Sequence, residues 1–123
     1  MLLPNGKLAI VDIRKLREYC LNPDSPRGHN KARVFATALG ITRKDAAKLR
    51  VKLLEIARTG EAQLGELDTN GQRYTITFEM ATEIGQAVVC SGWIIRHDET
   101  VARLTTCYVK KRKRGWQGKR LSY

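Results

Sequence analysis

The sequence predicts an α+β fold in which about three N-terminal helices pack on one face of a C-terminal antiparallel β-sheet of three to four strands. Two observations support this prediction. Apolar residues recur at helical spacing as far as Gly60, and after Gly65 they alternate with the two-residue period of a β-strand. Because the helices come first and the strands last, separate layers are favoured over alternating βαβ units. A length of 123 residues suits a single domain, which we place at residues 1–109 with a basic tail at 110–123.

The first predicted helix begins after Asp12, whose carboxylate can accept hydrogen bonds as an N-cap, and it ends near Leu21. The side chains that share its inward face are Ile13, Leu16, Tyr19 and Cys20. The stretch 22–28 that follows is dense in turn residues and contains two prolines, so we expect a loop there.

The second predicted helix begins at about Asn30 and stops at Gly40, a residue that tolerates the left-handed conformation common after helices. Its apolar stripe consists of Ala32, Phe35, Ala36 and Leu39. The third helix opens at Thr42, which together with Asp45 resembles a capping box, and it runs to Gly60. Its exposed face is basic, with Arg43, Lys44, Lys48, Arg50, Lys52 and Arg58.

Three strands are predicted after the helices. In the first, the apolar residues Tyr74, Ile76, Phe78 and Met80 alternate with the polar residues Arg73, Thr75, Thr77 and Glu79. The second strand, 87–95, is apolar on both faces, as a central strand is, so we expect Trp93 in the core. The third strand covers residues 102–109.

Charge is the unusual feature of the composition. The formal net charge is +11, and the tail from Lys110 onward contributes +7 of it, leaving +4 for the rest of the chain. This excess predicts an anionic partner, most commonly a nucleic acid, and Trp116 within the tail could stack on unpaired bases. The predicted nucleic-acid contacts are Arg33, Lys110, Lys111, Arg112, Lys113, Arg114, Trp116, Lys119 and Arg120. A solvated tail that merely keeps the protein in solution is the alternative.

Three isolated cysteines, Cys20, Cys90 and Cys107, provide neither a disulfide framework nor the paired spacing of a zinc site. We therefore expect no metal or cofactor and a reducing compartment, the cytoplasm. The apolar stretch at the N-terminus is too short to predict a signal peptide or a membrane span. The basic tail lacks the amphipathic helix or lipidation signal that would predict a membrane partner.

His29 is the first candidate for chemistry, because it follows the 22–28 loop at a predicted helix start and has Lys31 and Arg33 nearby. Helix N-termini favour anions such as phosphate, and a histidine can exchange protons near neutral pH. Cleavage of RNA without a metal ion needs a proton acceptor, a proton donor and cations for the phosphate. The alternative is a loop histidine that only hydrogen-bonds a turn.

The polar side of the sheet could form the other half of a cleft. Arginines bind phosphate oxygens through a two-pronged fork, and threonine hydroxyls can add a hydrogen bond. The predicted catalytic set is His29, Lys31, Arg73, Arg96, Thr106 and Tyr108. This site requires the sheet residues to converge on His29; otherwise the threonines belong to an ordinary solvated face.

Three segments, 21–35, 71–74 and 103–109, together with Trp93, resemble an uncharacterised bacterial domain family of about this length. The resemblance covers most of residues 3–109 and implies a bacterial source and a single-domain fold. More distantly, helices followed by an antiparallel sheet with a terminal Leu104-Thr105-Thr106 strand are similar to the barnase, EndoU, colicin and RelE group of ribonuclease toxins. This resemblance implies RNA cleavage without a metal ion by His, Lys, Arg, Thr or Tyr side chains.

Two function classes therefore follow from the sequence. The first is an RNA-binding domain of the ribonuclease-toxin type, with His29 as the proton-transfer residue. The second is a non-catalytic module, either a nucleic-acid binder or a toxin or antitoxin partner protein, and an acidic cognate protein of the antitoxin or immunity type is a further possible partner. The glycine turn before the basic third helix also faintly resembles a helix-turn-helix.

Overall fold

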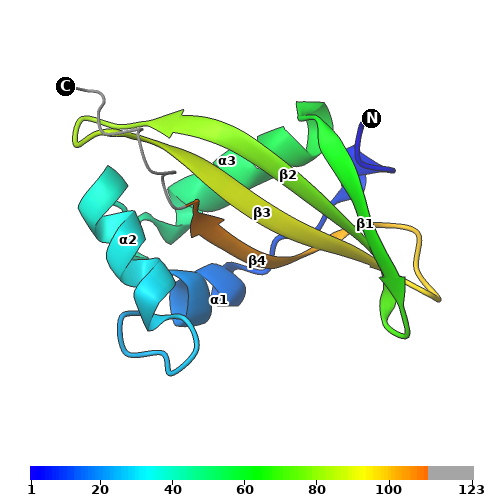
Figure 1. The fold of residues 1–123 in the computed structure, drawn as a ribbon, viewed down its shortest axis with the longest axis horizontal. Coiled ribbons are helices and arrows are strands. Elements are labelled where there is room, and N and C mark those ends of the chain that lie inside the picture. Colours follow the sequence, from blue (N-terminus) through cyan, green and yellow to red (C-terminus); the bar gives the residue numbers. More distant parts are fainter. Residues whose placement is uncertain (111–123) are drawn as a thin grey trace.

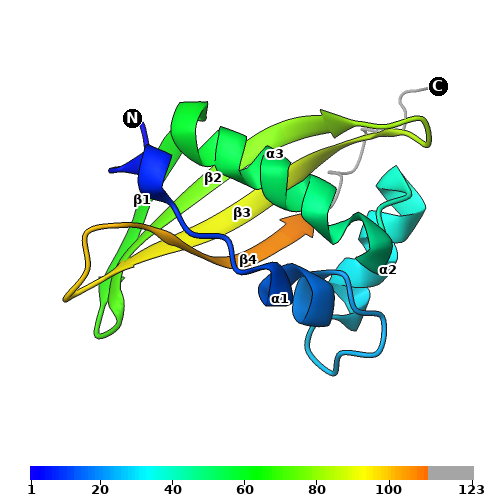
Figure 2. The same ribbon diagram turned by 180° about the vertical axis from the view of Figure 1, so that it is seen from behind.

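The computed structural model describes residues 1–110 and confirms the α+β architecture. Helices occupy the N-terminal half of the chain, and a four-stranded antiparallel sheet with the order β1-β2-β3-β4 follows them. Figure 1 views the sheet from the side opposite helix α3, and Figure 2 shows α3 lying across the other face. No helix within residues 1–110 has the length and apolar character needed to cross a membrane.

The helical part begins and ends at the predicted signals. Its elements are the 3-10 turn η1 (Gly6–Leu8), helix α1 (Ile13–Lys15), the π-helical turn η2 (Leu16–Cys20) that continues it, α2 (His29–Leu39), the 3-10 turn η3 (Arg43–Asp45) and α3 (Ala46–Thr59). The Asp12 side chain accepts a hydrogen bond from Arg14 N at 3.0 Å, and Gly40 adopts a left-handed φ of 67°. The Asp45 carboxylate accepts Thr42 N–H at 2.9 Å, so the predicted cap is formed.

The sheet contains one strand that the sequence did not predict. Its strands are β1 (Ala62–Asp68), β2 (Gly71–Ala81), β3 (Gln86–Arg96) and β4 (Arg103–Val109). The unpredicted strand is β1, an edge strand whose Leu64 and Leu67 are 64% and 68% exposed. A register shift between these two leucines interrupts the pairing with β2. Without a buried side or an unbroken two-residue period, β1 lacks the pattern by which strands are identified.

The opposite edge of the sheet is partly covered by the N-terminal segment. Ile10 forms a parallel bridge with Arg103 of β4, and its N–H donates to Ala102 O at 2.9 Å. The N–H of Leu104 in turn donates to Ile10 O at 3.0 Å. These contacts hold the start of α1 next to β4, where Figure 2 shows the N-terminal segment running beside that strand.

The core lies between the helices and one face of the sheet. Its largest fully buried side chains include Leu16, Phe35, Leu39, Leu49, Leu53, Ile76 and Trp93. Burying each of them stabilises the fold by about 2 kcal/mol. Trp93 is in the core as predicted, and its indole N–H donates to Ser91 Oγ at 2.9 Å. One member of the predicted stripes does not belong there: Ala36 is exposed, because α2 turns that side away from the sheet.

Candidate functional site

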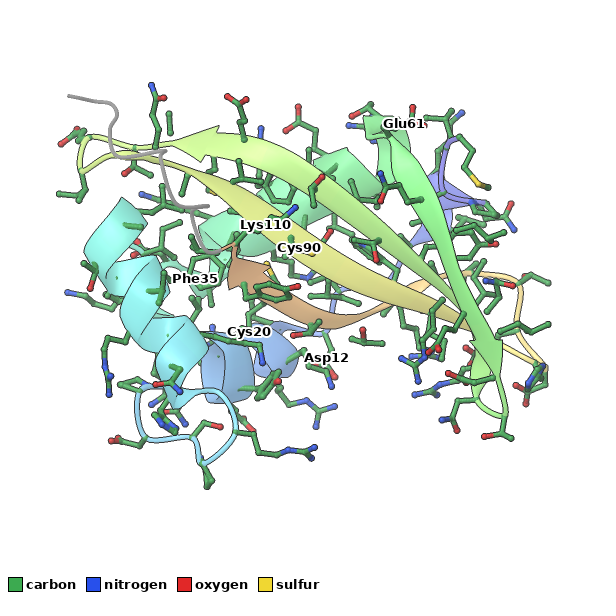
Figure 3. All side chains as sticks on the ribbon, in the orientation of Figure 1. Asp12, Cys20, Phe35, Glu61, Cys90 and Lys110 are labelled. Carbon is green, nitrogen blue, oxygen red and sulfur yellow. The ribbon has the colours of Figure 1, made fainter. Side chains whose placement is uncertain are left out.

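The face of the sheet opposite α3, here called the outer face, is polar and ordered in rows across three strands. Thr77, Cys90 and Tyr108 form one row, Thr75, Gly92 and Thr106 the next, and Arg73, Ile94 and Arg103 the third. Their neighbours along each strand face the core. Figure 3 shows the Cys90 side chain on the outer face beside β4. The predicted polar face therefore exists, and it brings Thr106 and Tyr108 close together.

At the β4 edge of this face, Lys31 of α2 meets two tyrosines. Its Nζ donates to Tyr19 Oη at 2.8 Å and lies 5.0 Å from the centre of the Tyr19 ring and 6.0 Å from that of Tyr108. We call Tyr19, Lys31, Thr106 and Tyr108 the hydroxyl–lysine cluster. No carboxylate within residues 1–110 forms an ion pair with Lys31, so its charge stays available to an anionic ligand.

The two tyrosines of the cluster differ in acidity. The pKa of Tyr19 is lowered from 10.0, chiefly by the hydrogen bond from Lys31, which stabilises the phenolate. The pKa of Tyr108 is instead raised, because of its contact with the Cys90 thiol and its partial burial. Of the two phenols, Tyr19 is therefore the one that gives up its proton more readily.

The hydroxyl of Thr106 has spare hydrogen-bonding capacity. It is near enough to Tyr19 to help lower the pKa of that phenol, yet its buried Oγ1 makes no hydrogen bond of regular geometry within residues 1–110. A buried hydroxyl without a regular partner is uncommon in folded proteins and calls for an explanation. The neighbouring Tyr19 phenol is the group that lies close enough to serve as this partner.

A shallow pocket of about 280 Å³ adjoins the cluster at Tyr19. The other residues that line it are Lys15, Arg27 and Thr105, so two more cations and another hydroxyl lie beside the phenol. None of the residues that line this pocket is acidic. Its chemistry suits a phosphate group, because cations and hydroxyls can surround the phosphate oxygens.

Arg73 and Arg96, two members of the predicted catalytic set, lie farther along the sheet. Arg73 forms a 2.6 Å ion pair with Asp68, and this guanidinium holds the pKa of the Asp68 carboxyl below its usual range. Arg96 is exposed at the end of β3, opposite Gly71. The positive charge of Arg73 is therefore already compensated, whereas Lys31 has no such partner in the described part of the chain.

His29 lies on a different side of α2 from Lys31. Successive helical residues are rotated by about 100°, so side chains two positions apart diverge widely. The Nδ1 atom of His29 is 3.1 Å from Ser25 O, and the ring lines a pocket of about 410 Å³ with Arg33, Arg43 and Lys44. We call this the His29 pocket. None of the other five predicted catalytic residues lines it.

Most of the predicted tail contacts lie outside the described residues: Lys111, Arg112, Lys113, Arg114, Trp116, Lys119 and Arg120. Lys110 is described and exposed, and its N–H donates to Val88 O at 2.8 Å, so this residue lies beside β3. Figure 3 marks Lys110 at the end of β4. Its position next to the Cys90 row places the start of the tail near the hydroxyl–lysine cluster.

Tyr19 is the residue that the sequence did not single out. It shares a helix face with Leu16 and Cys20, so its spacing indicated a core residue. The one signal was its type, because a tyrosine at the border of an apolar stripe carries a hydroxyl that needs a partner. That the partner is Lys31, twelve residues later, follows only from the packing of η2 against α2.

Comparison with known proteins adds one finding. The model of a protein family described as a domain of unknown function, DUF6883, matches residues 2–111, which is nearly the whole chain. A search of curated proteins gave no match.

Proposed function

The chain belongs to the DUF6883 family, and we propose that this member binds RNA and cleaves its backbone without a metal ion, with the hydroxyl–lysine cluster as the reactive centre. One observation carries the proposal. The Lys31 ammonium hydrogen-bonds the Tyr19 phenol at 2.8 Å and lowers its pKa, beside a pocket lined by cations and hydroxyls alone. A phenol made more acidic in a cationic setting is suited to proton transfer at a phosphodiester.

The proposed step uses the 2′-hydroxyl of RNA as the nucleophile. The proton of this hydroxyl passes to the Tyr19 phenolate, and a bond forms between O2′ and phosphorus. The P–O5′ bond breaks, and the leaving O5′ takes a proton from the Lys15 ammonium, which lines the same pocket as Tyr19. The products are a 2′,3′-cyclic phosphate and a 5′-hydroxyl end. Lys31 and Arg27 stabilise the charge that develops on the phosphate oxygens.

Other features support RNA as the substrate. The net charge of +11 favours a polyanion, and the basic tail begins beside the cluster at Lys110. The order of helices and strands, which resembles that of the ribonuclease toxins, supports the same reaction class.

The three thiols are free, as in a reducing compartment, so we propose a cytoplasmic protein. An acidic antitoxin or immunity protein would then be a natural inhibitor of the basic surface.

The test is cleavage of a labelled single-stranded RNA by the purified full chain in EDTA. We expect fragments with 2′,3′-cyclic phosphate ends, and no cleavage of an RNA that carries 2′-deoxyribose at the cut position. Tyr19→Phe should lower the cleavage rate about 100-fold or more and leave RNA affinity nearly unchanged, because it removes only the proton acceptor. Tyr74→Phe, which removes a phenol hydroxyl from the opposite face of the sheet, is the matched control.

The His29 hypothesis from the sequence is decided in the same assay. Loss of cleavage in His29→Ala but not in Tyr19→Phe would assign the proton transfer to His29. Tight RNA binding without turnover would leave the non-catalytic module as the function. Absence of both binding and cleavage would refute the proposal.

A further inference from the structure

We infer that the His29 pocket binds a nucleotide of the RNA next to the cleaved bond, with the base on an apolar floor and the phosphate at a cationic rim. The inference rests on the proposed function and adds a subsite that would make cleavage depend on the RNA sequence. The volume of the His29 pocket, about 410 Å³, lies within the range of small-molecule sites.

The floor of the pocket is apolar and made of small or flat side chains. Leu21 and Ala32 are buried beneath it, and Pro23 and Ala36 line its more open parts. Ala32 and Ala36 lie on one side of α2, and their small side chains leave room for a ligand above the helix. Ala36 is exposed and lines this space. A floor of this kind covers the face of a planar base better than it covers a hydrated ion.

The rim supplies positive charge from two elements. Arg33 projects from α2, while Arg43 and Lys44 come from η3. The Nε of Arg43 donates to Arg17 O at 2.8 Å, which fixes the guanidinium and leaves both terminal nitrogens for a phosphate. None of the nine residues that line the pocket is acidic. Apolar floor and cationic rim together match a ligand with a base at one end and a phosphate at the other.

His29 adds a polar group between floor and rim. Because the carbonyl of Ser25 can only accept a hydrogen bond, the Nδ1 of His29 must carry the proton in their 3.1 Å contact. The remaining ring atom, Nε2, then accepts a hydrogen bond when the ring is neutral and donates one when it is charged. It can therefore contact a base edge or a ribose hydroxyl, which gives His29 a binding role distinct from proton transfer.

The pocket and the hydroxyl–lysine cluster flank the first turn of α2. The loop 22–28 joins them, since Pro23 lines the His29 pocket and Arg27 lines the pocket at Tyr19. An RNA strand that follows this loop would pass from Arg27 at the first site to Pro23 at the second. This continuity favours a nucleotide over an acidic peptide as the occupant, although both carry negative charge.

Calorimetric titration of the full chain with the four nucleoside 5′-monophosphates, inorganic phosphate and adenosine tests the inference. We expect at least one monophosphate to bind about tenfold or more tightly than inorganic phosphate, because only the nucleotide uses the floor. Ala36→Phe fills the pocket without changing its charge and should weaken that binding about tenfold. Arg33→Gln should weaken it by a similar factor, about tenfold. The matched controls are Ala47→Phe and Lys48→Gln, exposed positions on α3 outside the pocket, which should leave affinity unchanged.

Three results would overturn the inference: no saturable monophosphate binding, equal affinity for inorganic phosphate, or binding that Ala36→Phe leaves intact. A glutamate-rich peptide that binds in place of every nucleotide, and loses affinity in Ala36→Phe, would assign the pocket to a protein partner instead. The same variants test the proposed function separately. If Tyr19→Phe still cleaves RNA while Ala36→Phe no longer binds the nucleotide, the subsite is supported and the assignment of Tyr19 is wrong. If Tyr19→Phe no longer cleaves RNA while Ala36→Phe still binds the nucleotide, only the subsite is refuted.

Discussion

The 2.8 Å hydrogen bond between Lys31 and Tyr19 joins two helices and changes the chemistry of a single phenol. The Lys31 ammonium also lies 5.0 Å from the centre of the Tyr19 ring and 6.0 Å from that of Tyr108, distances at which a cation is attracted to an aromatic face. Because this contact favours the phenolate, the pKa of Tyr19 lies below 10.0 even though partial burial acts in the other direction.

Replacing Lys31 with methionine tests this account independently of activity. Lys31→Met keeps an apolar stem but removes the ammonium, so the pKa of Tyr19 should rise and its phenolate should appear only at higher pH. The measurement is an absorbance titration of phenolate formation, with Tyr19→Phe used to identify the Tyr19 component. If cleavage depends on the phenolate, the pH at which the rate levels off should rise in the same direction. An unchanged Tyr19 midpoint in Lys31→Met would contradict the proposed cause.

Helix α2 separates two groups of residues that are close in sequence. The side that carries Lys31 reaches Tyr19 and Tyr108, whereas the side that carries His29 and Arg33 lines a separate pocket. The sequence prediction grouped His29 with Lys31 because both follow one loop, but helical rotation directs them to different sites. The single predicted site therefore corresponds to two adjacent sites in the structure, one on each side of α2.

The start of α3 offers a stability test at the scale of an element. Asp45→Ala removes the carboxylate that accepts Thr42 N–H, so it should lower the free energy of unfolding by about 1 kcal/mol. Urea denaturation monitored by circular dichroism would measure the change. Lys48→Ala, at an exposed position within α3, is the control and should change stability by less than about 0.5 kcal/mol. Equal stabilities of Asp45→Ala and the control would mean that the cap does not stabilise α3.

Over the whole molecule, positive charge is distributed unevenly. Arg73 and Arg103 on the outer face form ion pairs with Asp68 and Glu99. By contrast, neither the pocket at Tyr19 nor the His29 pocket has an acidic residue among those that line it. The net charge therefore favours polyanion binding at the end of the sheet where α2 and β4 meet, which Figure 1 shows as one side of the molecule.

Deleting residues 111–123 tests how far the tail adds to this surface. The deletion removes six positive charges, so RNA affinity should fall and its dependence on salt should weaken. For single-stranded RNA, the slope of log affinity against log salt should become shallower by up to roughly four if all six charges contact phosphates. Affinity measurements across a salt series give this slope. An identical slope for the full and the shortened chain would show that the tail does not contact the RNA.

Local signals predicted most of the fold. Asp12, Gly40 and the Thr42–Asp45 pair fixed the helix boundaries, because caps and stops depend on residues next to one another in sequence. Trp93 was placed in the core because its strand is apolar on both sides. Strand β1 escaped prediction for a related reason: an exposed edge strand with a register shift has no burial pattern to detect.

The sequence by itself determined the order of helices and strands, the polar outer face and the excess of positive charge, since each depends on local periodicity or on composition. The tertiary structure alone decided which side chains meet. It paired Lys31 with Tyr19 across twelve residues, placed Thr106 and Tyr108 beside them, and directed His29 into a separate pocket. Such contacts depend on how helices are rotated and packed against the sheet, and no spacing along the chain encodes that rotation.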